Sequence, residues 1–250
     1  MNSEGSGPPG GAPPPGVRTV PAVLAGATRI VLVRHGEARC NVDGVVGGLT
    51  GCTGLSPVGV TEAEALRDRL VRSGELAGTA AVYVSVLPRA LETAAIVAPG
   101  LGGLTAVADC DLCELHPGEA DGLTWKEFTE RFGGPNWDVD PDTVLAPGGE
   151  SWTGFVGRVA SVLTRTAADH GGELVVIFCH GGVVEASIEA LLPAAPGRGR
   201  LKLRTAHTSL TEWEWGPGGW TLLRYNDAAH LAGVTAWAPG DLISRTDQQA

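Results

Sequence analysis

The chain has 250 residues with a formal net charge of −10, and 43 % of its residues are hydrophobic, which is enough apolar surface to bury a core. An acidic chain has no basic surface for duplex nucleic acid or an anionic membrane, and no apolar run approaches the roughly 18 residues that span a bilayer. We therefore expect a globular protein that has neither nucleic acid nor a membrane as a partner. Its oligomeric state is not predicted.

The first 26 residues are predicted to form a disordered tail. Ten of the first 16 residues are glycine or proline, a composition that cannot bury enough apolar surface to fold. The tail also lacks the basic segment and the apolar core of a signal peptide. The five cysteines, an odd number, then indicate reduced thiols and a cytoplasmic location. Residues 27–250 are predicted to form a single domain without internal repeats.

From residue 27 onward, strands and helices are predicted to alternate. A β-branched run that ends at Arg34 predicts the first strand, and a glycine-rich loop follows it. Ser56 and Pro57 then predict the start of a helix, as its N-cap and its first residue. In chain order, the predicted elements are strand 29–34, helix 57–73, strand 80–85, helix 88–97, a weak strand 104–107, helices 125–131 and 151–169, strand 173–179, helix 182–192, and a hairpin of strands 209–215 and 220–225. This order predicts an α/β fold, a three-layer α/β/α arrangement with a mostly parallel central sheet and one antiparallel edge strand.

The two strongest predicted strands each end in a histidine followed by glycine. These histidines are His35 and His180, and in sheets of this class ligands bind at the carboxyl ends of the strands. Gly181 opens a helix whose first N–H groups favour an anion. Arg34 precedes His35, and Arg89 follows another strand, so each guanidinium can reach the same edge and bind two phosphate oxygens. The pattern predicts a phosphate-binding site at this edge of the sheet.

The remaining cysteines and histidines are expected to be structural. Cys110 and Cys113 form a CxxC pair, which can hold zinc or act in redox chemistry. No second pair and no nearby histidine is expected to complete such a site, so two small buried side chains are the favoured interpretation. We predict no metal and no cofactor. Histidines 116, 170 and 207 are expected on the surface or in loops, and His230 is a candidate for the border of the phosphate site.

Six short segments follow one another in the order of one family's motifs. They are Arg34-His35-Gly36-Glu37 with Asn41 downstream, Thr53 to Gly59, Ser85 to Ala94, Leu112 to Gly122, Pro147 to Ser151, and Cys179 to Val183. Together they resemble the histidine phosphatase superfamily, also called phosphoglycerate mutase-like, over about residues 30–231. Three positions depart from that pattern: residues 206–209 lack the family's frequent asparagine, Asp121 replaces a second glutamate, and Glu62 replaces a glutamine.

The resemblance implies phosphoryl transfer through a phosphohistidine on His35. Arg34, Arg89 and His180 would neutralise the phosphate oxygens in the transition state. Further donors implied by the resemblance are Asn41 and the N–H groups near Gly181. Because fixed cations then take the place of a metal ion, the implied activity is a metal-independent phosphomonoesterase of the histidine acid phosphatase type.

A carboxyl group is also needed, because the leaving oxygen must gain a proton. The resemblance places this proton donor at Glu114. Glu119 and Asp121 are close in sequence, and either of them is an alternative donor. The implied partner is a small-molecule phosphate ester, and the absence of a second basic cluster in the loops leaves its identity open.

Two other functions are alternatives. A phosphoglycerate mutase-type phosphotransferase must shield its phosphoenzyme from water with a closing lid. Only the modest stretches 42–53 and 133–149 are available for such a lid, so hydrolysis is favoured. A catalytically silent phospholigand-binding protein, from a different class, would be indicated by the loss of a catalytic residue, and all of them are present.

Overall fold

The computed structural model describes residues 24–192 and 203–234. Most of the predicted tail, residues 1–23, lies outside this part of the chain, as do residues 235–250, so the tail and the domain boundaries stay predictions. Within the described residues, no helix combines the length and the apolar character needed to cross a bilayer.

A six-stranded mixed sheet forms the centre of the fold, in the order β3-β2-β4-β1-β5-β6. The strands are β1 (Thr28–Arg34), β2 (Thr79–Val84), β3 (Val107–Ala108), β4 (Leu174–Cys179), β5 (Leu210–Gly216) and β6 (Gly219–Asp227). The first four strands are parallel to one another, and β5 is antiparallel to both β1 and β6. The predicted α/β class with a mostly parallel sheet is therefore confirmed.

The position of the antiparallel strand differs from the prediction. We expected it at the edge of the sheet, but β5 lies one place inside, and β6 forms the edge. The cause is the predicted hairpin, whose two strands pair down to Gly216 and Gly219 and so enter the sheet together. Because β5 is the strand of the hairpin that pairs with β1, β6 lies outside it.

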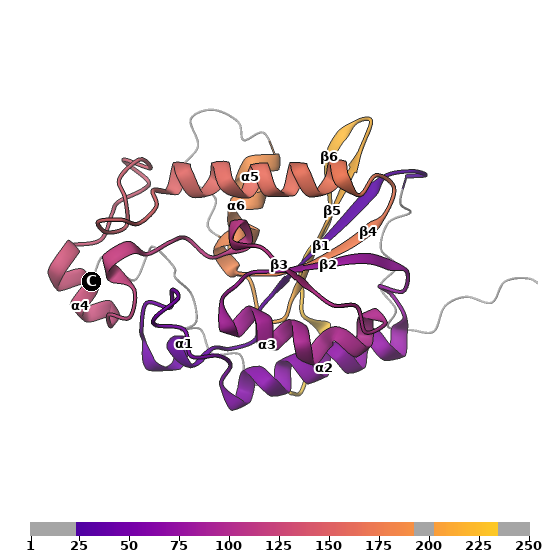
Figure 1. Ribbon diagram of the computed structural model, residues 1–250, viewed down its shortest axis with the longest axis horizontal. Coiled ribbons are helices and arrows are strands. Elements are labelled where there is room, and N and C mark those ends of the chain that lie inside the picture. Colours follow the sequence, from indigo (N-terminus) through magenta and orange to yellow (C-terminus); the bar gives the residue numbers. More distant parts are fainter. Residues whose placement is uncertain (1–23, 193–202, 235–250) are drawn as a thin grey trace, which may run out of the picture.

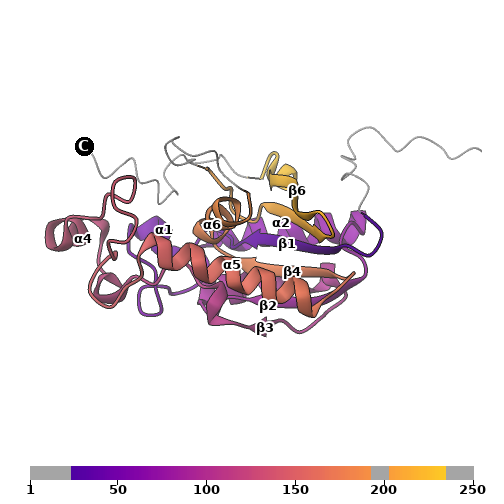
Figure 2. The ribbon, with the colours of Figure 1, turned by 90° about the horizontal axis from the view of Figure 1, so that it is seen from above.

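Helices cover both faces of the sheet, as Figures 1 and 2 show. Helices α2 (Pro57–Ser73) and α3 (Pro88–Val97) lie on one face, and α5 (Trp152–Asp169) and α6 (Gly181–Leu191) on the other. In β1, Ile30 and Leu32 belong to the apolar cluster that includes residues of α5 and α6, while Val31 and Val33 belong to the cluster of α2 and α3. A strand that is buried on both faces explains the uninterrupted apolar run in its sequence.

The loop predicted after His35 contains a helix that the sequence interpretation missed. This helix, α1 (Arg39–Asp43), has five residues and ends at Gly44, whose φ of +64° is the left-handed conformation that favours glycine. The other short helix, α4 (Trp125–Phe132), was predicted, and Thr124 caps it by accepting a hydrogen bond from the Glu127 N–H. Short 3₁₀ turns occupy Ala98–Leu101, Cys110–Leu112, Gly118–Ala120 and Ala229–Leu231.

Candidate active site

Three parallel strands end at the same level of the sheet. The pairing of β1 with β4 matches Arg34 with Cys179, and the pairing of β2 with β4 matches Val84 with Phe178. The next residue of each strand therefore leaves the sheet at one edge. The His35 N–H donates to the Cys179 carbonyl at 3.0 Å, and the Ser85 N–H donates to the Phe178 carbonyl at 3.0 Å. This register brings His35, His180 and Ser85 together.

Arg89 connects the two histidines. It follows Pro88 at the start of α3, and its Nε–H lies 3.1 Å from Nε2 of His35 and 3.2 Å from Nδ1 of His180. Its Nη1 donates to the Gly47 carbonyl at 2.7 Å, which fixes the guanidinium plane. The centroids of the two imidazole rings are 5.1 Å apart. The structure thus brings together three of the predicted site residues, and all three are buried.

The hydrogen bonds define the protonation of both rings. Nδ1 of His35 lies 2.6 Å from the Gly36 carbonyl, which can only accept, so Nδ1 carries the proton and Nε2 keeps its lone pair. In His180, Nδ1 accepts from Arg89, so Nε2 carries the proton and donates to Ser85 Oγ at 2.8 Å. The unprotonated nitrogen of His35 therefore faces the guanidinium of Arg89.

Both imidazoles are held in the neutral form. Burial, followed by the positive charge of Arg89, lowers the pKa of His35 well below its usual value of 6.5. The same two causes, with a contribution from Arg34, lower the pKa of His180 in the same way. A neutral His35 has a nucleophilic lone pair at pH 7, whereas an imidazolium has none.

Arg34 and the start of α6 lie side by side. Arg34 is buried at the end of β1, and its Nη1 donates to the Thr205 carbonyl. A Cβ at Gly181 would lie 3.4 Å from Nε of Arg34, so the first residue of α6 packs directly against this guanidinium. Two guanidinium groups and a helix N-terminus near one neutral imidazole form a site that can bind a phosphate dianion.

Of the three carboxylates that the sequence left open, Glu114 reaches the first turn of α6. Its Oε2 accepts a hydrogen bond from the Gly182 N–H at 3.0 Å. Glu119 is exposed instead and lies 3.4 Å from Arg131. Asp121 accepts hydrogen bonds from three N–H groups of the loop at residues 48–51. Asp121 therefore shapes a loop, and Glu114 is the carboxylate that binds the first turn of α6, two residues after His180.

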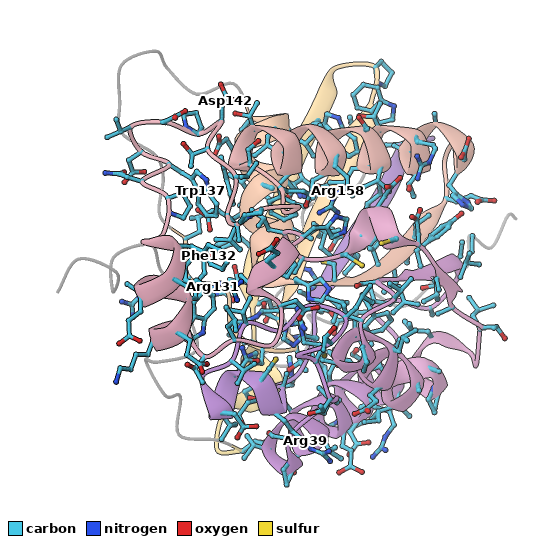
Figure 3. The ribbon with its side chains drawn as sticks, turned by 60° about the vertical axis from the view of Figure 1, so that its left-hand side comes forward. Arg39, Arg131, Phe132, Trp137, Asp142 and Arg158 are labelled. Atoms are coloured by element: carbon cyan, nitrogen blue, oxygen red, sulfur yellow. The ribbon has the colours of Figure 1, made fainter. Side chains whose placement is uncertain are left out.

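The backbone around Glu114 is fixed by Arg158, which α5 presents toward this segment (Figure 3). Its guanidinium donates to the carbonyls of Asp111, Cys113 and Glu114, at 2.8, 3.0 and 3.3 Å. The same guanidinium also forms an ion pair with Glu150, at 2.6 Å. Three carbonyls bound by one rigid cation hold the segment in one conformation.

Asn41 has a structural contact in this arrangement. Its Oδ1 accepts a hydrogen bond from the Ala38 N–H at 3.0 Å and so supports the start of α1. Its neighbour Cys40 packs against Gly47, the residue whose carbonyl binds Arg89. A role for Asn41 in binding phosphate stays a prediction.

Two residues of the cluster were not assigned a role from the sequence. His207, expected on the surface or in a loop, is buried, and its ring centroid lies 5.9 Å from that of His35. His207 does lie in a loop, but the surface alternative was wrong, because its Nδ1 lies 3.6 Å from the buried carboxylate of Glu62 on α2, a partner that is 145 positions away in the chain. The second residue, Ser85, contacts His180. In the sequence, a role for Ser85 was indicated only by its position at the start of the segment that contains Arg89.

The interpretation of the CxxC pair also needs correction. We expected no histidine near Cys110 and Cys113, but the structure places His116 beside them, with three ligand atoms within 4.8 Å of one another. Cys110 is also exposed, so the expected pair of buried side chains was wrong for this residue. The position of His116, three places after Cys113 in the sequence, was a signal for this arrangement.

Comparisons with known proteins identify the family and support the fold. The model of the histidine phosphatase superfamily (branch 1) matches residues 30–228. The phosphoglycerate mutase-like protein 4 of Arabidopsis thaliana is 32 % identical over 210 residues, which cover 81 % of this chain and 86 % of that protein. A metal-independent phosphoserine phosphatase of the same plant is 32 % identical over 215 residues, which cover 83 % and 84 %. Among solved structures, a mycobacterial glucosyl-3-phosphoglycerate phosphatase in complex with VO3 has a TM-score of 0.67 and 26 % identity, over 80 % of this chain and 99 % of that one.

Proposed function

The chain belongs to the histidine phosphatase superfamily, and on that premise we propose that it hydrolyses a small phosphate monoester through a phosphohistidine on His35. One observation carries this proposal: the unprotonated Nε2 of His35 lies 3.1 Å from the guanidinium of Arg89, in a buried site that keeps the imidazole neutral. The related phosphatases act on small phosphorylated metabolites, phosphoserine and glucosyl-3-phosphoglycerate, which supports this substrate class.

The first step transfers the phosphoryl group to the protein. Nε2 of His35 forms a bond to phosphorus while the bond from phosphorus to the ester oxygen breaks. Arg34 and Arg89 stabilise the charge on the three equatorial oxygens. Glu114, in its protonated form, gives a proton to the departing alkoxide, which leaves as an alcohol.

The second step releases phosphate. Water attacks phosphorus as the Nε2 to phosphorus bond breaks, and Glu114, now a carboxylate, takes the proton of the water. The bond electrons return to Nε2, so His35 is again neutral. Each group ends in its starting state, and this chain's own cations supply the charge stabilisation throughout.

The test uses p-nitrophenyl phosphate with the full chain. We expect turnover in the presence of EDTA, and in His35→Ala a loss of kcat by a factor of about 10⁴ or more. A ³²P-labelled substrate, quenched in mid-turnover, should leave acid-labile label on the peptide that contains His35. Label on a serine or an aspartate would refute the assignment of the nucleophile.

The same assays separate the two alternatives. A phosphotransferase would yield a rearranged phosphate ester from a phosphoglycerate and little inorganic phosphate. A silent binding protein would bind phosphate and take up no label.

A further inference from the structure

A second cluster of reactive side chains lies next to the active site. Sγ of Cys110 is 3.6 Å from Sγ of Cys113 and 3.8 Å from Nε2 of His116. All three ligand atoms lie within 4.8 Å of one another. None of these three residues takes part in the proposed phosphoryl transfer, although Glu114 lies between them in the sequence.

The two distances fit the edges of a tetrahedral zinc site. With a zinc to sulfur distance of about 2.3 Å and a zinc to nitrogen distance of about 2.0–2.1 Å, tetrahedral angles place two sulfurs about 3.8 Å apart and a sulfur and a nitrogen about 3.6 Å apart. The observed separations of 3.6 and 3.8 Å agree with these values. A disulfide, in contrast, requires a sulfur to sulfur distance of about 2.05 Å, and it does not involve the imidazole of His116.

The backbone that carries the three ligands is held in place. A 3₁₀ turn spans Cys110–Leu112, and the Cys113 N–H donates to the Cys110 carbonyl at 3.0 Å, so both thiols point to one side. Arg158 binds the carbonyls of Asp111, Cys113 and Glu114, as described above. A preformed loop reduces the entropy that metal binding must overcome.

Each of two ligands also has an outer partner. The Oε2 atom of Glu150 lies 3.6 Å from Nδ1 of His116, the position from which a carboxylate orients a metal-binding imidazole. Ser85 donates from Oγ to Sγ of Cys113 at 3.3 Å. The nearby carboxylate favours a proton on Nδ1 of His116, which leaves Nε2 as the ligand atom, and the hydroxyl of Ser85 stabilises a thiolate on Cys113.

We propose that Cys110, Cys113 and His116 bind one Zn²⁺ ion. Two thiolates and an imidazole are the donors that zinc prefers, and the charge of two thiolates balances that of the ion. Asp109 and Asp111 are both paired with Arg165, at 3.0 and 3.2 Å, so the proposed ligand set consists of the two thiols and the imidazole. Cys110 is exposed, which gives the ion access.

The role of the bound zinc follows from the position of Glu114. This residue lies within the chelate ring between Cys113 and His116, so an ion that joins its neighbours restricts the segment that presents its carboxylate to α6. The ion stays outside the reacting atoms and acts on the conformation of the loop. This inference about binding holds whether or not the protein is a phosphatase.

The experiment is a titration of the reduced, metal-free full chain with Co²⁺ and then with Zn²⁺. We expect one equivalent of Co²⁺ to produce a thiolate-to-cobalt charge-transfer absorption and tetrahedral d–d bands, which stoichiometric Zn²⁺ removes. Cys110→Ser should weaken binding at least tenfold and lower the charge-transfer absorption to about half, because one of the two thiolates is lost, and His116→Gln should change the d–d bands. Zn²⁺ should raise the Tm of the wild type by more than that of Cys110→Ser.

The controls separate this site from other thiols. Cys52→Ala removes a buried cysteine outside the cluster, and it should bind Co²⁺ as the wild type does. Spectra without charge transfer, or full binding by Cys110→Ser, would overturn the proposal. A disulfide between Cys110 and Cys113 in the isolated protein, with no metal uptake after reduction, would also overturn it.

Activity measurements distinguish this proposal from the proposed function. Because the ion lies outside the reacting atoms, Cys110→Ser should still hydrolyse p-nitrophenyl phosphate, with or without EDTA. Zinc binding without any turnover in the wild type would leave the metal site standing and refute the phosphatase.

Discussion

Arg89 binds both imidazoles of the site with a single N–H group, at 3.1 and 3.2 Å. A lysine at this position keeps the charge, but its ammonium lacks the planar fork that also reaches the Gly47 carbonyl. We expect Arg89→Lys to lower kcat/KM for p-nitrophenyl phosphate by a factor of about 10² to 10³, comparable to the loss of one transition-state donor.

Arg131→Lys is the matched control for this change. Arg131 is exposed on α4 and forms an ion pair with the exposed Glu119. Its replacement should leave kcat/KM unchanged. Equal effects of the two substitutions would contradict the role of Arg89 in the site.

Glu114 is expected to act only where the leaving group needs a proton. For an alkyl phosphate, Glu114→Gln should lower kcat by a factor of about 10² to 10⁴, the usual contribution of general acid catalysis. p-Nitrophenolate is a stable anion, so the rate with p-nitrophenyl phosphate should fall much less. Glu119→Gln removes an exposed carboxylate that is close in sequence, and it serves as the control. If Glu114→Gln lowers the rate equally on both substrates, Glu114 is not the proton donor.

The sequence predicts which residues form the active site better than it predicts the buried residues that pack around them. Arg34, His35 and His180 follow from strands that are recognisable from local composition. His207 does not, because its burial depends on Glu62, a partner on α2 that no local pattern connects to it. The sequence did contain one signal for a buried partner of Glu62. This charged residue lies on the same buried face of the predicted helix as Ala63 and Leu66.

At the scale of elements, the meeting of β1, β2 and β4 at one edge was predictable, because parallel strands end on the same side of a sheet. Helix α1 was not predictable from periodicity, because five residues are too few to show an apolar face. The place of β5 inside the edge depends on which strand pairs with β1, a long-range choice that the hairpin sequence does not encode.

The start of α6 offers a test of how elements position the site. An added Cβ at Gly182 would lie 2.1 Å from Oε1 of Glu114. Gly182→Ala should therefore displace this carboxylate and lower kcat for an alkyl phosphate, toward the loss expected for Glu114→Gln. The helix itself tolerates alanine, so the free energy of unfolding should change little.

Gly157→Ala in α5 is the matched control, because nothing lies within 4 Å of its added Cβ. Alanine is the better helix former, so this variant should be stabilised by about 0.5 to 1 kcal/mol, with unchanged activity. Circular dichroism in urea and steady-state kinetics measure both effects. An active Gly182→Ala enzyme would show that Glu114 needs no fixed contact with α6.

At the scale of the whole molecule, an ion-pair network joins α2 to the edge strand β6. Arg69 lies 2.7 Å from Glu75 and 2.6 Å from Asp227, and Arg224 lies 2.9 Å from Glu75. Burial has the largest single effect and raises the pKa of Asp227, but the hydrogen bonds from Arg69 and the Ala229 N–H, together with the charges of Arg69 and Arg224, lower that pKa to about 2. Asp227 therefore stays ionised in the folded protein below its usual titration range.

His230 packs against this network and titrates differently. Its Nε2 lies 2.8 Å from Oγ1 of Thr208, and its ring faces Arg69, Asp227, Glu62 and Glu75. Burial, followed by the charge of Arg69, lowers the pKa of His230 to about 4, against the opposing effect of the three carboxylates. The pKa values of His35 and His180 are lowered in the same direction.

These shifts fix the sign of the pH dependence of stability. Between the unfolded pKa of 6.5 and the lower pKa in the folded protein, the unfolded chain binds more protons, so the free energy of unfolding falls as the pH falls. Each such histidine contributes up to about 1.4 kcal/mol per pH unit within its window. Asp227 adds to the loss only below about pH 4, where its unfolded form gains a proton. Between pH 7 and pH 5 the histidines therefore dominate.

We expect the wild type to lose stability in urea between pH 7 and pH 5, and His230→Gln to lose about 1 to 2 kcal/mol less over the same range. The glutamine keeps a polar group near Thr208 but has no proton to bind, so the difference isolates the titration of one ring. Urea unfolding of both proteins at the two pH values measures it. Parallel losses would mean that His230 binds its proton equally in the folded and unfolded chain, and that the pH dependence comes from the two active-site histidines, whose neutral form the proposed mechanism requires.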